Sequence, residues 1–309
     1  MKEKTKILIA PSTFAVIDSA PLELLQRAGL DIIVNPYGRK LNRRELTALL
    51  PGVVGVLAGL ESLDKDVLEK SQLRAISRCG AGLDNVDLVT AKNLGIMVFN
   101  TPDAPTEAVA ELAVAMMILL CRQVPEMSRA LSEGAWKKMT GFQLRDKAVV
   151  IVGYGRIGQA VAQLLRPFRP RLIIVDPFAD TSIQDGCESL SLQDALHQAD
   201  VITLHASGDR ELLGREAFSL MKPGVILLNA SRGALIDENE LLNALINGTV
   251  SGAWLDTFSR EPYDGPLKSF PQVILTPHIG SYAAQCRSLM EMQAAENLLF
   301  ALADLKTRE

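Results

Sequence analysis

The chain has 309 residues, of which 48% are hydrophobic and 22% charged, and its formal net charge at pH 7 is −4. A chain of this length exceeds the usual size of a single hydrophobic core, so we expect two domains. Because positive and negative residues are interspersed, the sequence has no basic region to attract nucleic acid or an anionic membrane, and we expect neither as a partner.

The N-terminal stretch MKEKTKILIAPS predicts a first strand and not a signal peptide, because its apolar run is short. The longest apolar run, residues 108–121, contains Glu111 and is too short to span a bilayer, so it predicts a buried helix. The four cysteines, at positions 79, 121, 187 and 286, lack metal-ligand spacing. We therefore expect no metal site, reduced thiols and a cytoplasmic protein.

Apolar runs typical of β-strands alternate with helical patterns from one end of the chain to the other. The predicted strands are KILIA (6–10), DIIV (31–34), VVGVLAG (53–59), LRAISRCG (73–80), IMVFN (96–100), AVVIVG (148–153), LIIVD (172–176), DVITLHA (200–206), GVILLNA (224–230), SGAWLD (251–256) and VILTPH (273–278). Continuous Val, Ile and Leu runs separated by helices are typical of parallel sheets that are covered on both faces. The predicted fold class is α/β, with doubly wound sheets.

A domain boundary is expected near residue 100, where NTPDAPTEAVAE contains two prolines and then starts a helix at Thr106 that runs to about Gln123. The residues before this boundary contain enough predicted strands to form a sheet of their own. After His278, one long amphipathic pattern predicts a helix that returns to the first domain. The predicted domains are residues 1–99 plus 281–309, and residues 100–280.

The strongest cofactor motif follows the strand at 148–153 and opens a helix. Its residues are Gly153, Tyr154, Gly155, Arg156, Ile157 and Gly158. Glycines at this spacing permit a tight turn and a close approach of the backbone to a pyrophosphate, which the helix N-terminus attracts. The next strand ends in Asp176, where a carboxylate can bind both hydroxyls of an adenosine ribose and repel a 2′-phosphate. We therefore predict NAD in preference to NADP; the alternative is an ordinary glycine turn with a capping aspartate.

Three residues in the second half of the chain suggest catalysis. Arg232 lies in a Ser-Arg-Gly turn after a strand, where its guanidinium can bind a carboxylate in bidentate fashion. Glu261 precedes His278 by seventeen residues, and a carboxylate on one imidazole nitrogen fixes the tautomer and stabilises imidazolium. Alone, these residues could be a surface arginine, a solvated carboxylate and a helix-cap neighbour. Alcohol oxidation by hydride transfer needs such a base, and a carboxylate substrate needs such a cation, so their order after a dinucleotide motif favours catalysis.

Longer motifs cover nearly the whole chain from about residue 73. They are LRAISRCGAGLDNVDL (73–88), NTP (100–102), VGYGRIG (152–158), LMKPGVILLNASRGALIDENELLNAL (220–245), GAWLDTFSREP (252–262) and LTPHIGS (275–281). By these motifs the sequence closely resembles the D-isomer-specific 2-hydroxyacid dehydrogenase family, and within it the D-3-phosphoglycerate dehydrogenases. The first seventy residues match that family only in general pattern.

This resemblance implies a Rossmann NAD-binding domain inserted in a flavodoxin-like substrate domain. It implies that Arg232 binds the substrate carboxylate, that His278 is the acid and base, and that Glu261 is its partner. Beside the glycine-rich turn and Asp176, the implied cofactor-binding residues are Thr106, His205, Ala206, Ala230, Ser231, Asp256 and Gly280. The implied substrate-binding residues are Arg78, Cys79, Gly80, Ala81, Gly82, Arg232 and Ser281.

We therefore expect NAD-dependent interconversion of a D-2-hydroxy acid and its 2-oxo acid, with 3-phosphoglycerate and 3-phosphohydroxypyruvate as a candidate pair. The main alternative is a non-catalytic NAD-binding sensor like the corepressors that share this fold; formate or phosphite oxidation fits the motifs less well. The apolar helix 106–123 predicts a homodimer, and a chain that ends directly after the returning helix predicts no regulatory domain. A phosphorylated substrate would need cations in the first domain, and Arg39, Arg43, Arg44 and Arg78 are available.

Overall fold

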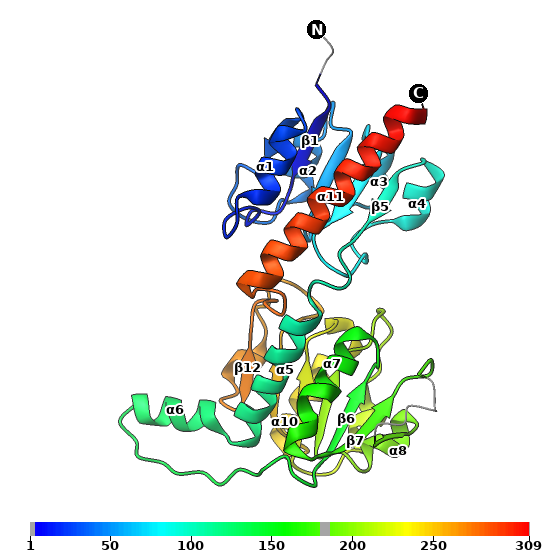
Figure 1. Cartoon of the computed structure of the whole chain (residues 1–309). Coiled ribbons are helices and arrows are strands. Elements are labelled where there is room, and N and C mark those ends of the chain that lie inside the picture. The colour runs from blue at the N-terminus through cyan, green and yellow to red at the C-terminus, as the bar shows by residue number, and fades with distance from the viewer. Residues whose placement is uncertain (1–3, 180–185, 309) are drawn as a thin grey trace. The chain divides into compact units, whose positions relative to one another are not determined.

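The computed structural model of the chain describes residues 4–179 and 186–308, and parallel strands alternate with helices throughout (Figure 1). Contacts divide the chain into two units. Unit 1 comprises Met1–Pro105 and Ser281–Glu309, and unit 2 comprises Thr106–Gly280. The first crossing lies after Pro105, a few residues beyond residue 100, because the helix that begins at Thr106 packs in a core of unit 2. The paired strands of both units run parallel, which confirms the predicted α/β class.

The sheet of unit 1 has five strands in the order β2-β1-β3-β4-β5. These strands are β1 (Lys6–Ile9), β2 (Asp31–Val34), β3 (Gly55–Ala58), β4 (Ala75–Arg78) and β5 (Met97–Phe99). The helices are α1 (Ala20–Arg27), α2 (Arg43–Leu49), α3 (Lys65–Glu69), α4 (Leu88–Asn93) and α11 (Ala284–Arg308). β2 lies on one side of β1, and β3 lies on the other side. Successive strands are therefore added to the sheet in opposite directions before and after this point, which makes β1 and β3 the switch point of the sheet.

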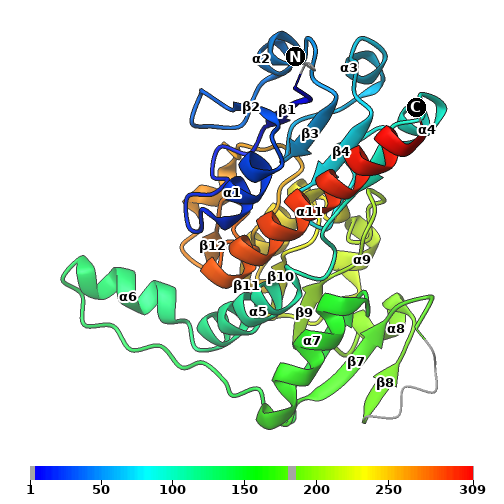
Figure 2. The same ribbon diagram turned by 45° about the horizontal axis from the view of Figure 1, so that its top comes forward.

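Different helices cover the two faces of this sheet, because successive side chains of a strand point to opposite faces. Ile7 and Ile9 of β1 belong to a core with Leu25 of α1 and Leu298 of α11. Leu8, between them, belongs to the core on the other face, which includes buried residues of α2, α3 and α4. Figure 2 shows α1 and α11 side by side. The last helix of the chain thus completes the core of the first sheet.

The sheet of unit 2 has seven strands in the order β12-β11-β10-β9-β6-β7-β8. They are β6 (Ala148–Val152), β7 (Arg171–Val175), β8 (Cys187–Ser189), β9 (Val201–Leu204), β10 (Val225–Asn229), β11 (Val250–Leu255) and β12 (Val273–Leu275). The helices are α5 (Thr106–Cys121), α6 (Val124–Ser132), α7 (Arg156–Leu165), α8 (Leu192–Leu196), α9 (Arg215–Ser219) and α10 (Glu238–Asn247). The switch point lies between β6 and β9, as in a Rossmann sheet. The sequence did not predict β8, because CES contains no apolar run.

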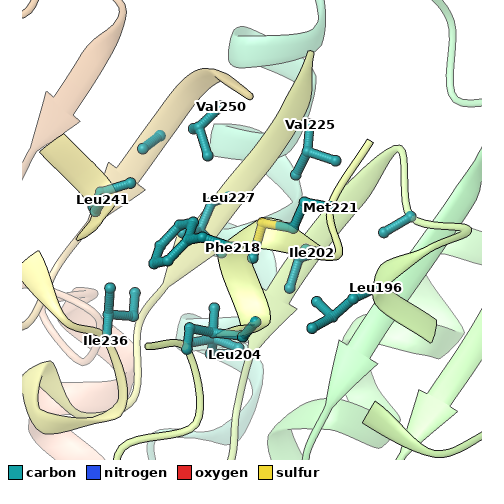
Figure 3. Packing of buried hydrophobic residues seen from close by; sticks show 14 of the residues in the cluster. Leu196, Ile202, Leu204, Phe218, Met221, Val225, Leu227, Ile236, Leu241 and Val250 are labelled. Atoms are coloured by element: carbon teal, nitrogen blue, oxygen red, sulfur yellow. The ribbon is translucent and has the colours of Figure 1, made fainter. Parts of the chain in front are cut away.

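One core of unit 2 lies between the sheet and α8, α9 and α10 (Figure 3). Leu204 and Leu227 project from the sheet there, and Phe218 and Leu241 project from the helices. The opposite core joins α5 and α7 to the other face of the same strands. At about 25 cal/mol per Å² of buried apolar surface, burial on both faces is the main stabilising contribution to this parallel sheet. Because helices cover both faces of the sheet, a ligand can bind at the carboxyl edge of the strands.

The helix α5 is apolar because it packs in a core of unit 2, as the apolar run at 108–121 predicted. Its buried residues include Ala113 and Met117, both 0% exposed. No single helix among the described residues is long and apolar enough to cross a membrane; by length and composition, only α5 and α6 taken together would pass, and they are bent by 66°.

Candidate active site

The glycine-rich turn lies at the carboxyl end of β6, beside the switch point of the sheet. Gly153 has a φ of +92°, and a Cβ there would overlap the backbone of Ala206; a Cβ on Gly158 would overlap the carbonyl oxygen of Gly153. Glycine is therefore required at both positions. A Cβ on Gly155 would meet nothing within 4 Å, and no side chain caps the N-terminus of α7. The N–H groups of that first turn can therefore receive a pyrophosphate.

Asp176, directly after β7, holds this turn from the side. Its Oδ2 accepts a hydrogen bond from Tyr154 N at 2.7 Å, and its Oδ1 accepts one from Phe178 N at 2.8 Å. A carboxylate oxygen accepts more than one hydrogen bond, so both oxygens can also bind ribose hydroxyls. Of the two other residues of the motif, Arg156 is exposed at the start of α7 and Ile157 packs against the core.

Oγ1 of Thr106 and Nδ1 of His205 are among the buried polar atoms that have no hydrogen-bond partner within the described residues. His205 directly follows β9, and Val109, in the first turn of α5 after Thr106, lies against Gly280. Buried polar atoms in proteins are almost always hydrogen-bonded, so orphaned atoms here suit a ligand with polar groups. The glycine cradle, the carboxylate of Asp176 and these two atoms together fit NAD.

His205 is held as a neutral side chain. Burial lowers its pKa from 6.5 to about 4, and its Nε2 lies 2.9 Å from Oγ1 of Thr203. Because the pKa is lower in the folded protein than in the unfolded chain, the folded protein is fully stable above pH 6.5 and loses stability as the pH falls toward 4.

We predict that the free energy of unfolding decreases by about 3 kcal/mol across this pH range through His205 alone. A His205→Asn variant cannot take up this proton, so its stability should change less with pH. Urea unfolding of both proteins at neutral pH and near pH 4.5 measures the difference. An identical pH dependence in the two proteins would contradict the burial argument.

The turn that carries Arg232 is fixed by Asn229, the last residue of β10, which is 1% exposed. Asn229 Nδ2 donates to the carbonyl oxygen of Arg232 at 2.8 Å, and its Oδ1 accepts from both N and Oγ of Ser231 at 3.0 Å. Arg232 Nη1 donates to the carbonyl oxygen of Ser231 at 2.8 Å. Ala230 lies between these residues, so the predicted positions 230–232 form one short turn at the carboxyl edge.

The loop that carries Glu261 packs directly against this turn. A Cβ on Gly233, the residue after Arg232, would overlap the carbonyl group of Phe258. Phe258 N in turn donates to Glu261 Oε1 at 3.2 Å. His278 Nδ1 lies 3.1 Å and 3.2 Å from the two carboxylate oxygens of Glu261, with the side chains 35% and 31% exposed respectively. The structure thus joins the predicted pair and places the backbone beside Arg232 against the same loop.

Asp256, directly after β11, holds the backbone that carries His278. It is 1% exposed, its Oδ1 accepts from Ile279 N at 2.8 Å and from Thr276 Oγ1 at 2.6 Å, and its Oδ2 accepts from Gly280 N at 2.7 Å. His278 has a φ of +56°, a conformation that non-glycine residues rarely adopt, so these hydrogen bonds stabilise a strained turn. The sequence suggested Asp256 as a cofactor residue and gave no sign of this positioning role.

The other predicted substrate residues belong to unit 1: Arg78, Cys79, Gly80, Ala81, Gly82 and Ser281. The backbone after β4 is fixed there, because Gly80 N donates to Thr101 Oγ1 at 2.8 Å and Asn100 Nδ2 donates to the carbonyl oxygen of Ala81 at 2.7 Å. The guanidinium of Arg78 folds over Gly80, and its Nη1 donates to the carbonyl oxygen of Cys79. That these residues bind a substrate stays a prediction.

The family model described as D-isomer specific 2-hydroxyacid dehydrogenase, NAD binding domain, matches residues 114–280. A glyoxylate reductase from Thermococcus litoralis is 36% identical over 283 residues, which cover 85% of this chain and 83% of that protein. The crystal structure of a glyoxylate reductase from Paecilomyes thermophila has a TM-score of 0.86 and 28% identity, covering 97% of this chain and 96% of that chain.

A D-3-phosphoglycerate dehydrogenase from Mycobacterium bovis is 38% identical over 272 residues, which cover 85% of this chain and 52% of that protein. The chain therefore spans about half the length of the phosphoglycerate dehydrogenases that it matches. The matched region includes the glycine-rich turn, Arg232, Glu261 and His278, which are the residues that the geometry above places at the carboxyl edge of unit 2.

Proposed function

The chain belongs to the D-isomer-specific 2-hydroxyacid dehydrogenase family, and from this premise we propose that it is an NAD-dependent oxidoreductase that interconverts a D-2-hydroxy acid and the corresponding 2-oxo acid. The observation that carries the proposal is the pair of His278 and Glu261, whose side chains meet at 3.1 Å on the same sheet edge as the glycine-rich turn. A carboxylate-bound imidazole beside a hydride-carrier site is the proton donor and acceptor that this redox reaction requires.

Arg232, Glu261 and His278 have separate roles in the proposed reaction. Arg232 binds the substrate carboxylate and holds the neighbouring carbonyl group in register. Glu261 engages Nδ1 of His278, which leaves Nε2 as the nitrogen that donates a proton to the carbonyl oxygen during reduction and takes it back during oxidation. Bound NADH supplies the hydride that reduces the carbonyl carbon, and the glycine-rich turn, Asp176, Thr106 and His205 would hold it.

The names of the relatives suggest two substrate types: a phosphorylated three-carbon acid, as in the phosphoglycerate dehydrogenases, and a short unphosphorylated acid, as in the glyoxylate reductases. Both have the 2-oxo acid group that Arg232 and His278 would contact, so these two residues cannot distinguish them. The residues that distinguish them have to contact the rest of the substrate.

We predict that the protein oxidises NADH in the presence of at least one of glyoxylate, hydroxypyruvate and phosphohydroxypyruvate, and that a three-carbon product is the D-isomer. Absorbance of NADH gives the rate, and chiral chromatography gives the configuration of the product. If NADH binds but none of the three acids is reduced, the proposal is wrong and the alternative of a non-catalytic NAD-binding sensor gains support.

We also propose that the protein is a homodimer, through α6 and not through α5 as the sequence suggested. Both views show α6 and the segment that follows it extending away from the sheet of unit 2 (Figures 1 and 2). α6 has no buried residue, and Leu131 and Trp136 are 56% and 81% exposed. Sedimentation equilibrium would give the mass; a monomer at high concentration would contradict this proposal. Cys79, Cys121 and Cys286 are buried as free thiols, and we propose on that basis a reducing compartment such as the cytoplasm.

A further inference from the structure

The loop that carries Glu261 is fixed by burial only at its two ends. It runs from Phe258 to Tyr263, and the four residues between them lie at the surface. The rings of Phe258 and Tyr263 stack at the base of the loop, with centroids 4.4 Å apart and planes inclined by 23°, and both pack against a core of unit 2. Surface residues that bury little are held in one conformation by their hydrogen bonds, so the position of Glu261 depends on the hydrogen bonds of this loop.

Glu238 supplies a hydrogen-bond acceptor to the loop from outside it. Its Oε1 accepts from Ser259 N at 3.1 Å and from Ser259 Oγ at 2.8 Å. Ser259 lies two residues before Glu261, whose own Oε1 accepts from Phe258 N. Hydrogen bonds to an ionised acceptor are roughly twice as strong as those between neutral groups. The carboxylate of Glu238 therefore anchors the loop close to the residue that contacts His278.

Glu238 is itself held by a rigid element. It is the first residue of α10 and follows the N-cap Asp237, whose Oδ1 accepts from the backbone N of Asn239 and of Glu240. Leu241, one turn along the helix, is fully buried in the core of unit 2. A carboxylate in the first turn of a helix is also stabilised by the helix dipole. The hydrogen bonds to Ser259 thus tie a surface loop to a helix that the core keeps in place.

Glu240 offers a comparison within the same turn of α10. Its Oε1 pairs with Nε of Arg215 on α9 at 3.2 Å, and the side chain of Arg215 is 87% exposed. Both glutamates lie in the first turn, so each contributes a similar interaction with the helix dipole. They differ in that Glu238 bonds to the loop of Glu261 and Glu240 pairs with the neighbouring helix.

We propose that Glu238 is a positioning residue, which anchors Ser259 and thereby keeps Glu261 against Nδ1 of His278. This inference rests on the proposed function and adds a residue that acts through Glu261. A carboxylate on Nδ1 holds the proton of the neutral imidazole on that nitrogen and leaves Nε2 to face the substrate. Without the anchor, Glu261 is held less firmly, and the imidazole exchanges between its two tautomers.

The first test observes the imidazole directly by NMR. The chain contains three histidines, so labelling with [15N]histidine gives the signals of three rings, and His278→Gln identifies those of His278. At alkaline pH, where imidazole is neutral, we expect the parent protein to show Nδ1 protonated and Nε2 unprotonated. In Glu238→Ala both 15N signals of His278 should move toward each other, because the tautomers exchange. In the control Glu240→Ala they should stay at their parent positions.

The second test measures kcat and the Kd for NADH. Glu238→Ala should lower kcat by roughly 10- to 100-fold, the effect of a small displacement of a catalytic group, and leave the Kd within about twofold. Glu238→Gln keeps an acceptor oxygen for Ser259 and should recover most of the loss. In a Glu261→Gln background, Glu238→Ala should change kcat by less than about twofold, because Glu238 acts through Glu261. Glu240→Ala should retain the parent rate within about twofold.

Parent-like 15N signals of His278 in Glu238→Ala would overturn the inference, whatever the activity of that variant. Equal losses of kcat in the parent and Glu261→Gln backgrounds would also overturn it, because a merely structural defect slows both alike. Ser259→Ala removes one of the two hydrogen bonds without changing α10, and it should move the same signals in the same direction by a smaller amount. These outcomes differ from failure of the proposed function, in which no acid is reduced but the NMR signals still respond to Glu238→Ala.

Discussion

Replacing His278 with glutamine will lower kcat by roughly 100- to 10,000-fold, the usual contribution of a positioned acid or base. Glutamine has a similar size and can still hydrogen-bond to Glu261, but it cannot donate and recover a proton at neutral pH. The glycine-rich turn, Asp176 and Thr106 are untouched, so NADH should bind as it does to the parent protein. Steady-state rates and a fluorescence titration with NADH measure the two effects separately.

His197→Gln is the matched control, because His197 is exposed at the end of α8 and lies outside the site. It should retain the parent rate within about twofold, as surface substitutions usually change little. A His278→Gln protein that is folded, binds NADH and turns over at the parent rate would show that His278 is not the proton donor.

Replacing Gly233 with alanine will destabilise the protein by about 3 kcal/mol and remove most of its activity. The added Cβ would overlap the carbonyl group of Phe258 and crowd the backbone of Ser259, and backbone atoms cannot yield as the end of a side chain can. Overpacking of this kind costs about 1–3 kcal/mol and occasionally more. Since the contact joins the Arg232 turn to the Glu261 loop, relief of the overlap has to separate catalytic residues.

Urea unfolding and the rate of NADH oxidation test this prediction together. Gly252→Ala is the matched control within unit 2, because its Cβ would make only ordinary contacts, at 3.4 Å from Gln272 O and from a side-chain carbon of Leu120. The control should change the unfolding midpoint little. Equal stability and activity in Gly233→Ala and Gly252→Ala would show that the contact between the two loops is unimportant.

Much of the fold was predictable because its strands are buried on both faces. Runs such as AVVIV at β6 and VILLN at β10 are apolar at every position, which is the pattern that burial in a parallel sheet requires. β8 lacked that pattern, since its three residues are half-buried or exposed at the sheet edge. The apolar run of α5 was predicted as a buried helix and the structure confirms it, but composition cannot tell whether the rest of such a helix also packs on a partner.

The catalytic residues could be predicted as a set from the sequence, but the hydrogen bonds that position their backbone could not. His278 and Glu261 could be paired by their order along the chain and by resemblance to the family, and the structure places them in contact. Asp256 accepts hydrogen bonds from the backbone N–H groups of Ile279 and Gly280. This contact depends on the register of β11 and β12, which no local sequence pattern encodes.

The measurement that tests the central claim most directly is a double-mutant cycle on kcat with His278→Gln, Glu261→Gln and the two combined. If Glu261 acts through the imidazole that it contacts, removing it matters only while His278 is present. The account predicts that the double variant is no slower than His278→Gln alone, within about twofold. Losses that multiply in the double variant would contradict it, because the two residues would then contribute independently.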